Sequence, residues 1–90
     1  MTLSLENQNN VFYAKGMIDE YNSEVLKRYI LLQFQKNSNV TIDISGVFKI
    51  DKYGMRVLTS LYRNSLEKDK KFRIVGYGCK EIYDEFLASA

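Results

Sequence analysis

The sequence alternates strand-like and helix-like segments, and this alternation limits the chain to a small set of folds. The segments "VFYAKG" (11–16), "VTIDI" (40–44) and "KFRIV" (71–75) have the apolar patterns and bounding turn residues of β-strands. Between them lie stretches in which apolar residues recur at helical spacing. Parallel strands joined by helices take right-handed crossovers in nearly all proteins. We therefore predict an α/β fold with a small, mostly parallel β-sheet and helices packed on it.

The two ends of the chain each add an element to this prediction. A short strand in "LSL" (3–5), followed by the polar turn "ENQNN", predicts an N-terminal antiparallel hairpin. The segment "KEIYDEFLASA" predicts a last helix, whose apolar face consists of Ile82, Tyr83, Phe86 and Leu87. The predicted order is β-β-α-β-α-β-α, and the 90 residues are expected to form a single domain, 1–90, with one core.

The two internal helices are expected to be amphipathic. The first is predicted to start at a cap residue, Asn22 or Ser23, and to run to about Gln35. Its predicted apolar face consists of Val25, Leu26, Tyr29, Ile30, Leu32 and Phe34. The predicted face of the second helix consists of Val57, Leu58, Leu61, Tyr62 and Leu66. Both faces should pack on the sheet.

Composition limits the cellular compartments and the classes of partner that we expect for this chain. Hydrophobic residues make up 46% and charged residues 27% of the chain, which is typical of a globular protein. The net charge of +2 argues against a nucleic-acid partner, which favours a clustered basic face. "MTLSLENQNN" does not resemble a signal peptide, and no apolar stretch approaches membrane-spanning length. A single cysteine, Cys79, fits a reducing compartment, so we expect a soluble cytoplasmic protein without membrane insertion.

The residue types that carry most enzyme chemistry are scarce in this chain. Histidine is absent, and a lone cysteine offers no metal-binding set. Asp43 and Asp51 could bind magnesium together, but Asp51 could equally cap a helix. "GYGCKE" (76–81) matches neither of the two common glycine-rich phosphate-binding patterns. We expect a non-catalytic binding module that uses neither metal nor cofactor.

The stretch "IDKYG" (50–54) lies at the predicted passage from a strand into a helix. The start of a helix favours anions, because free backbone N–H groups and the positive end of the helix dipole converge there. The residue in this position is a cation, Lys52. Either Lys52 has drifted in at small cost, with its charge in water, or it meets an acidic partner. The neighbouring Tyr53, Met55 and Arg56 are of the residue types enriched at protein interfaces.

On both sides of this junction the sequence resembles the STAS domain, named for sulfate transporters and anti-sigma factor antagonists. "VTIDISGVFKIDKYGMRVLTSLYRNSLEKDKKFRIVGYGCKEIYDEF" follows the family pattern of an apolar strand, an Asp-containing turn, a helix, a strand and a last helix. Upstream, "FYAKGMIDEYNSEVLKRYI" matches the family's strand, glycine, hydrophobic-Asp pair and helix. The resemblance covers roughly residues 10–87.

Carried over to this sequence, the resemblance places Asp43 at the end of the central strand and matches Asp51 and Gly54 to the family's Asp and Gly. In the family, the residue after the Asp is usually a serine or threonine that a partner kinase phosphorylates, which releases the antagonist from its anti-sigma factor. Here that residue is Lys52, so phosphorylation is not expected at the family position. Ser45, one loop earlier, is a secondary candidate for modification.

The resemblance implies two alternative functions. In the first, the chain is an anti-sigma factor antagonist that binds a kinase-type anti-sigma factor through the loop and helix start at Asp51–Arg56. The residues of this predicted site are Asp51, Lys52, Tyr53, Gly54, Met55 and Arg56. In the second, it is the accessory subunit of a lipid-asymmetry ABC transporter and docks on the ATPase; a chain that stops at Ala90 favours this alternative. An enzyme that uses Asp43 and Asp51 with a metal is a third, less favoured reading.

Overall fold

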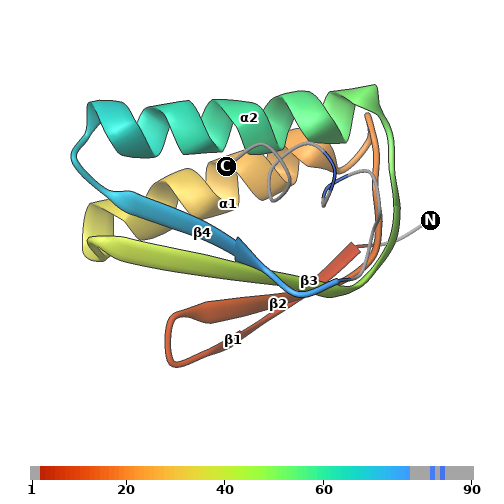
Figure 1. Cartoon of the computed structure of the whole chain (residues 1–90), viewed down its shortest axis with the longest axis horizontal. Helices are drawn as coiled ribbons and strands as arrows, with labels where there is room; N and C mark the ends of the chain where they lie inside the picture. Colours follow the sequence, from red (N-terminus) through yellow and green to blue (C-terminus); the bar gives the residue numbers. More distant parts are fainter. Residues whose placement is uncertain (1–2, 78–81, 83, 85–90) are drawn as a thin grey trace.

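The computed structural model describes residues 3–77, Ile82 and Asp84 of the chain. Helices α1 (Ser23–Lys36) and α2 (Lys52–Glu67) lie side by side on one face of a sheet with strand order β1-β2-β3-β4 (Figure 1). The strands are β1 (Leu3–Gln8), β2 (Val11–Ile18), β3 (Asn39–Ile50) and β4 (Lys71–Val75). β1 is antiparallel to β2, whereas β2, β3 and β4 are mutually parallel. This arrangement confirms the predicted fold class.

The N-terminal hairpin turns over two residues rather than over the whole segment "ENQNN". Asn9 and Asn10 have φ angles of 54° and 67°, as a two-residue turn of the type that matches strand twist requires. Asparagine tolerates this left-handed backbone better than most residues do. The backbone N–H of Asn10 also donates to the side chain of Asn7, at 3.2 Å. Residues 6–8 therefore belong to β1, and the predicted first strand was too short.

β3 is longer than predicted, because the segment expected to be a loop after residue 45 continues the strand to Ile50. Its second half pairs with β2, where Gly16 is opposite Val47 and Ile18 is opposite Ile50. Two register shifts, each of which gives β3 one residue more than β2, interrupt this pairing and disturb the alternation of apolar and polar residues in β3. That alternation is the signal by which a strand is recognised in a sequence. Ser45 therefore lies within a strand and not in a loop.

The core lies between the sheet and the two helices. Leu26, Ile30 and Phe34 of α1 are fully buried, and the Phe34 ring meets Phe72 of β4 edge to face with centroids 6.0 Å apart. In α2 the buried apolar side chains are Val57, Leu58 and Leu61. Ile82, the one residue of the predicted last apolar face that is described, is also buried in this core. Tyr83, Phe86 and Leu87, the other three residues of that predicted face, lie outside the described residues.

Four apolar residues assigned to the helix faces point outwards instead. Val25 and Leu32 of α1 are 64% and 54% exposed, and Tyr62 and Leu66 of α2 are 46% and 62% exposed. The core of α1 follows residues 26, 30 and 34, and a helix turns by about 100° per residue, so residues 25 and 32 lie on the opposite side. In α2 the small Gly54 and Ser65 complete the buried face instead. Within the described residues, neither helix combines the length and hydropathy that a membrane span requires.

Asp19, rather than Asn22 or Ser23, organises the start of α1. Asn22 occupies the cap position but accepts no hydrogen bond from the first turn of the helix. The carboxylate of the buried Asp19 accepts from the backbone N–H groups of Tyr21 and Asn22, at 2.9 and 3.1 Å. In return the Asp19 N–H donates to the Asn22 side chain, at 2.9 Å. The side chain of Asn22, the predicted cap, thus binds the preceding turn instead of the helix. Glu20 lies within this turn, between Asp19 and Asn22, and the hydrogen bonds fix its position.

Candidate interaction surface at the start of α2

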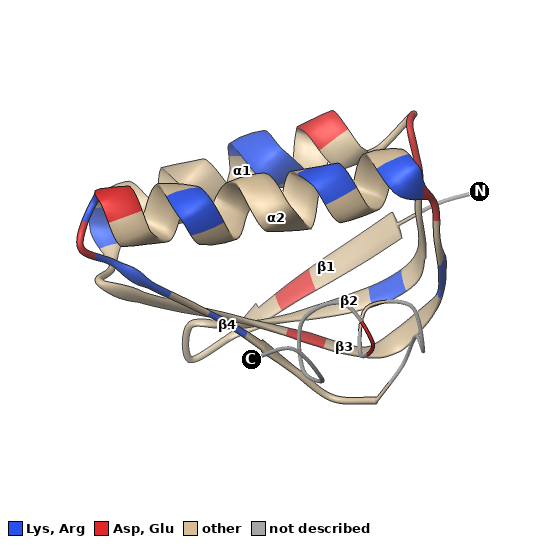
Figure 2. Cartoon of the chain, turned by 45° about the horizontal axis from the view of Figure 1, so that its top comes forward, with Lys and Arg blue, Asp and Glu red and all other residues tan. Residues whose placement is uncertain are grey.

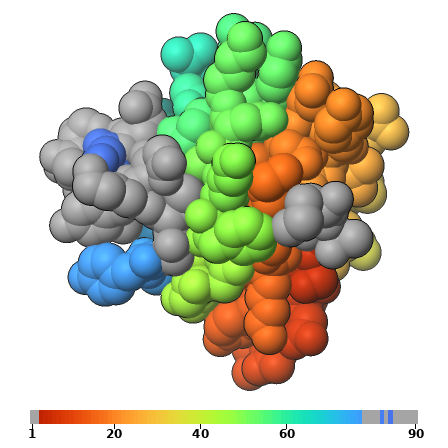
Figure 3. Space-filling model, turned by 90° about the vertical axis from the view of Figure 1, so that its right-hand side faces the viewer, coloured from red at the N-terminus to blue at the C-terminus, as the bar shows by residue number. Residues whose placement is uncertain are grey.

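Asp51 joins the start of α2 to the connection between β2 and α1. Its Oδ1 atom accepts from the Gly54 N–H at 2.9 Å, which confirms the helix-cap interpretation. Its Oδ2 atom accepts from the Glu20 N–H at 3.0 Å, and its own N–H donates to the Ile18 carbonyl at 3.0 Å. Figure 3 shows this end of the molecule, with the start of α2 (green) beside the β2–α1 connection (orange). The carboxylate has a structural role that needs no metal.

The possible magnesium site formed by Asp43 and Asp51 is contradicted by the geometry. Asp43 lies opposite Tyr13, and Ile50, the residue before Asp51, lies opposite Ile18. Five residues of β2 at about 3.3 Å each therefore separate the two positions by roughly 17 Å, which is too far for a shared ion. The Asp43 carboxylate instead accepts from the Ser45 N–H at 2.8 Å. Among the described residues, no three Asp, Glu, Cys or His side chains come together as a metal site would require. Cys79 lies outside the described residues.

Gly54 permits α2 to approach the sheet closely. It is buried in the first turn of the helix, and a Cβ at this position would lie 2.6 Å from Ile50 Cγ1 and 2.8 Å from Ile18 Cγ2. It would also lie 3.0 Å from the Ile18 carbonyl oxygen. Asp51 and Gly54 therefore act together: one fixes where α2 begins, and the other sets its distance from β2 and β3. Both are internal to the fold rather than contact groups for a partner.

Lys52, Tyr53 and Arg56 are the exposed members of the predicted site. The Lys52 Nζ atom lies 5.3 Å, and the Arg56 Cζ atom 5.6 Å, from the centre of the Tyr53 ring. A cation over an aromatic ring gains about 0.5–1 kcal/mol at an exposed site, which offsets the roughly 0.3–1 kcal/mol cost of a cation at a helix start. Lys52 is therefore held over a ring, and its place at the helix start carries little net cost.

Met55 differs from these three residues. It is partly buried and packs against the core, so little of its side chain is available to a partner. Of the six residues predicted for the site, the structure brings three together on the surface. The other three, Asp51, Gly54 and Met55, support them from below.

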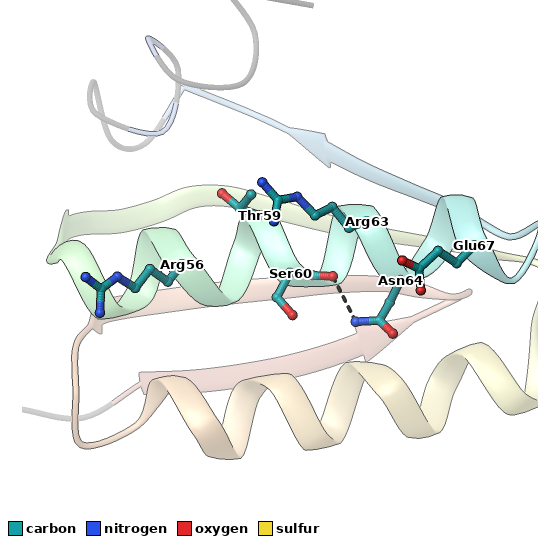
Figure 4. A pocket seen from close by; sticks show the side chains of 6 residues that line it. All are labelled: Arg56, Thr59, Ser60, Arg63, Asn64 and Glu67. Carbon is teal, nitrogen blue, oxygen red and sulfur yellow. Dashed lines mark hydrogen bonds between the residues drawn. The ribbon is translucent and has the colours of Figure 1, made fainter.

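Two hollows flank the outer side of α2. The first, of about 330 Å³, lies between the helices, where Glu20, Glu24 and Lys27 face Tyr53 and Arg56. The second, of about 400 Å³, runs along α2 from Arg56 to Glu67 and includes Thr59, Ser60 and Arg63 (Figure 4). The site predicted from the sequence did not include Arg63 or the three glutamates that line these hollows, Glu20, Glu24 and Glu67. The spacing of Arg56 and Arg63 along the sequence places them on one side of α2. The groove between the helices, however, depends on how α1 and α2 pack against each other.

Ser45, the secondary candidate for modification, has an acidic neighbour. It is exposed in β3, and its N–H is bound by the carboxylate of Asp43. Gly76, with a φ angle of 97°, crosses close by, so that a Cβ on it would lie 2.5 Å from Ser45 Oγ and 2.8 Å from Asp43 Oδ1. A phosphate on Ser45 would meet the Asp43 charge and the backbone at Gly76, which makes this serine a poor counterpart of the family's phospho-acceptor.

A model of the STAS domain matches residues 2–80. The chain belongs to the STAS domain family. No curated protein matches the sequence, so the comparisons that follow rest on the three-dimensional structure.

Solved structures of other STAS-like proteins share the fold at low sequence identity. An anti-sigma factor antagonist from Mycobacterium paratuberculosis superimposes with a TM-score of 0.69 at 22% identity, over 98% of this chain and 77% of that one. The anti-sigma factor antagonist SpoIIAA in its unphosphorylated form gives 0.71 at 12% identity, over 93% and 81%. A putative anti-sigma factor antagonist from Thermotoga maritima gives 0.71 at 11% identity, over 97% and 80%.

The fold also matches part of a larger protein. The chain superimposes on Mglu with a TM-score of 0.66 at 14% identity, over 82% of this chain but only 19% of that protein. At these identities the likeness demonstrates the fold alone.

Proposed function

We propose that this STAS domain is a non-catalytic, cytoplasmic protein-interaction module of the anti-sigma factor antagonist kind. It binds a kinase-type anti-sigma factor through the start of α2, where Lys52, Tyr53 and Arg56 make contact and Asp51, Gly54 and Met55 position them. Lys52 stands in place of the phospho-acceptor, so phosphorylation at this position does not regulate binding. The domain needs no metal or cofactor, and nucleic acid is not its ligand.

The observation that carries this proposal is the exposed group of two cations around the Tyr53 ring. Tyrosine and arginine are the residue types that dominate binding energy at protein interfaces. The Tyr53 ring already has two cations, at 5.3 and 5.6 Å from its centre, so less side-chain entropy is lost when a partner covers it. A lysine at a helix start, in turn, complements an acidic group on the partner better than it serves the helix itself.

Affinity purification of the tagged chain from its own cells, with identification by mass spectrometry, tests the proposal. Recovery of a small ATP-binding protein of the kinase type supports it. The alternative, an accessory subunit of a lipid-asymmetry ABC transporter, predicts recovery of an ABC ATPase with its membrane subunits. Recovery of that ATPase would overturn the sigma-factor pathway while leaving the interaction surface to be tested by mutation.

The substitution Lys52→Asp separates binding from folding. It introduces the charge that a phosphate would carry, and we expect capture of the partner to fall at least about tenfold, through repulsion of an acidic group. Stability should rise, by up to about 1 kcal/mol, because an acidic side chain is favourable in the first turn of a helix. Quantitative pull-down and urea unfolding measure the two effects.

Two further variants complete this experiment. Lys15→Asp makes the same change of charge on the sheet face that α1 and α2 do not cover, and it should leave capture unchanged. Lys52→Ser restores the hydroxyl that the family usually has and tests whether the positive charge itself contributes to binding. Equal capture by wild type and Lys52→Asp would mean that Lys52 has drifted into this position without a role in binding.

A further inference from the structure

Three cations form a line along the side of α2 that faces away from the sheet. Lys52, Arg56 and Arg63 are four and seven residues apart, and eleven residues complete about three helical turns. They therefore share one side of the helix, opposite the buried Leu58 and Leu61. Figure 2 shows this line of blue segments along α2. We call the three residues the basic row; its length is about 16 Å at 1.5 Å per residue.

The basic row has no ionic partner among the described residues, and the two nearest cations on its first turn repel each other. α2 contains one acidic residue, Glu67 at its C-terminal end, and none in its first turn. Like charges four residues apart on a helix cost roughly 0.2–0.5 kcal/mol, and Lys52 and Arg56 are so placed. The contacts of Lys52 and Arg56 with the Tyr53 ring offset this cost. Arg63 has no ring contact or ion pair among the described residues, so interactions within the chain do not account for the whole row.

The groups between the cations are suited to carboxylates. Thr59 and Ser60 lie between Arg56 and Arg63 along the second hollow (Figure 4). A guanidinium group binds a carboxylate with two parallel hydrogen bonds, and a nearby hydroxyl can supply a third. The Thr59 hydroxyl already donates to the Met55 carbonyl at 2.9 Å, so Ser60 is the hydroxyl donor that remains for a ligand.

The charges around the row limit where an acidic ligand can lie. Glu20 and Glu24 line the groove between α1 and α2 beside Tyr53, whereas Lys27 is the one cation on that wall. A carboxylate deep in this groove would meet both acids. Glu67 lies beyond Arg63 at the other end of the second hollow. An acidic ligand is therefore best accommodated along the outer crest of α2, from Lys52 to Arg63.

We propose that the basic row binds an acidic segment of the partner protein, with carboxylates spaced to meet Lys52, Arg56 and Arg63. This deepens the proposed function and rests on it, because it extends the same surface along α2 to Arg63 and states the chemistry of the partner. An anionic membrane or a nucleic acid fits less well. Membrane-binding clusters usually hold four to eight basic residues, and a net charge of +2 gives no broad basic face.

The test titrates the complete ¹⁵N-labelled chain with two helical peptides. One carries Glu at positions i, i+4 and i+11, and the other carries Gln at the same positions. We expect the Glu peptide alone to shift the amide signals of residues 52–63, with an affinity that falls as salt rises. Arg63→Glu should weaken binding about tenfold, whereas Glu24→Lys should strengthen it. Arg73→Glu, an identical exchange on β4, should have no effect.

Three results would overturn this inference. They are equal binding of the Gln peptide, signal shifts outside α2, and unchanged affinity in Arg63→Glu. Binding of duplex DNA or phosphatidylglycerol vesicles with the same dependence on Arg63 would also overturn it, in favour of a general anion surface. The two proposals can fail separately: if Lys52→Asp abolishes capture of the natural partner but Arg63→Glu does not, only the extension to Arg63 is wrong. If the peptide binds but natural capture ignores Lys52, the proposed function is wrong.

Discussion

Gly54→Val is expected to lower the free energy of unfolding by about 3 kcal/mol. The first added carbon would lie 2.6 Å from Ile50 Cγ1 and 3.0 Å from the Ile18 carbonyl oxygen, and such overpacking typically costs 1–3 kcal/mol or more. Valine is a better helix former than glycine, but that gain is below about 1 kcal/mol. The steric cost therefore prevails. Urea unfolding, with an unchanged slope, measures the difference.

Ser60→Val is the matched control for this experiment. It places the same branched side chain in the same helix at a partly exposed position, where only helix propensity is at stake. We expect a change within about 0.7 kcal/mol. A Gly54→Val protein as stable as wild type would mean that Ile18 and Ile50 can move aside, and that the spacing between α2 and the sheet is not set by this glycine.

Asp51→Ala is expected to cost about 2 kcal/mol of stability and to weaken partner binding as well. Loss of the cap on Gly54 typically costs about 1 kcal/mol. Loss of the bond from the Glu20 N–H removes a further charge-assisted hydrogen bond, at a partly solvated site, of about 1 kcal/mol. Lys52 and Tyr53 follow directly on the cap, so a frayed first turn would disperse the binding group. Thermal unfolding and pull-down under native conditions measure the two effects.

Two variants show whether Asp51 acts through these bonds. Asp51→Asn retains an oxygen that can cap Gly54, so it should recover about half of the lost stability. Asp43→Ala removes a carboxylate that, among the described residues, accepts one hydrogen bond, from the Ser45 N–H, and its cost should stay below about 1 kcal/mol. If Asp51→Ala were no more destabilising than Asp43→Ala, the hydrogen bonds by which Asp51 joins the start of α2 to the β2–α1 connection would add nothing measurable to stability.

The candidate site could be predicted in part from the sequence, and the errors of that prediction have a common origin. Sequence spacing located the start of α2 and the unusual Lys52, because a helix start depends on neighbouring residues. It did not distinguish the exposed Tyr53 and Arg56 from the partly buried Met55, since that distinction depends on the direction in which the helix faces the sheet. It did not include Arg63, although the residue lies on the same side of α2, because the sequence pattern that indicated a site ends in the first turns of the helix.

The class of fold, the order of the described elements and membership in the STAS family could all be read from the amino-acid sequence. The first two follow from apolar periodicity and turn residues, which act over a few neighbouring positions, and the third follows from the match of the sequence to the family model. Only the tertiary structure decided the length of β3, the exposure of Val25 and Leu32, and the bond from Glu20 to Asp51 across 31 positions of sequence. Each of these depends on register and packing between segments far apart in the chain, and no local pattern records such contacts.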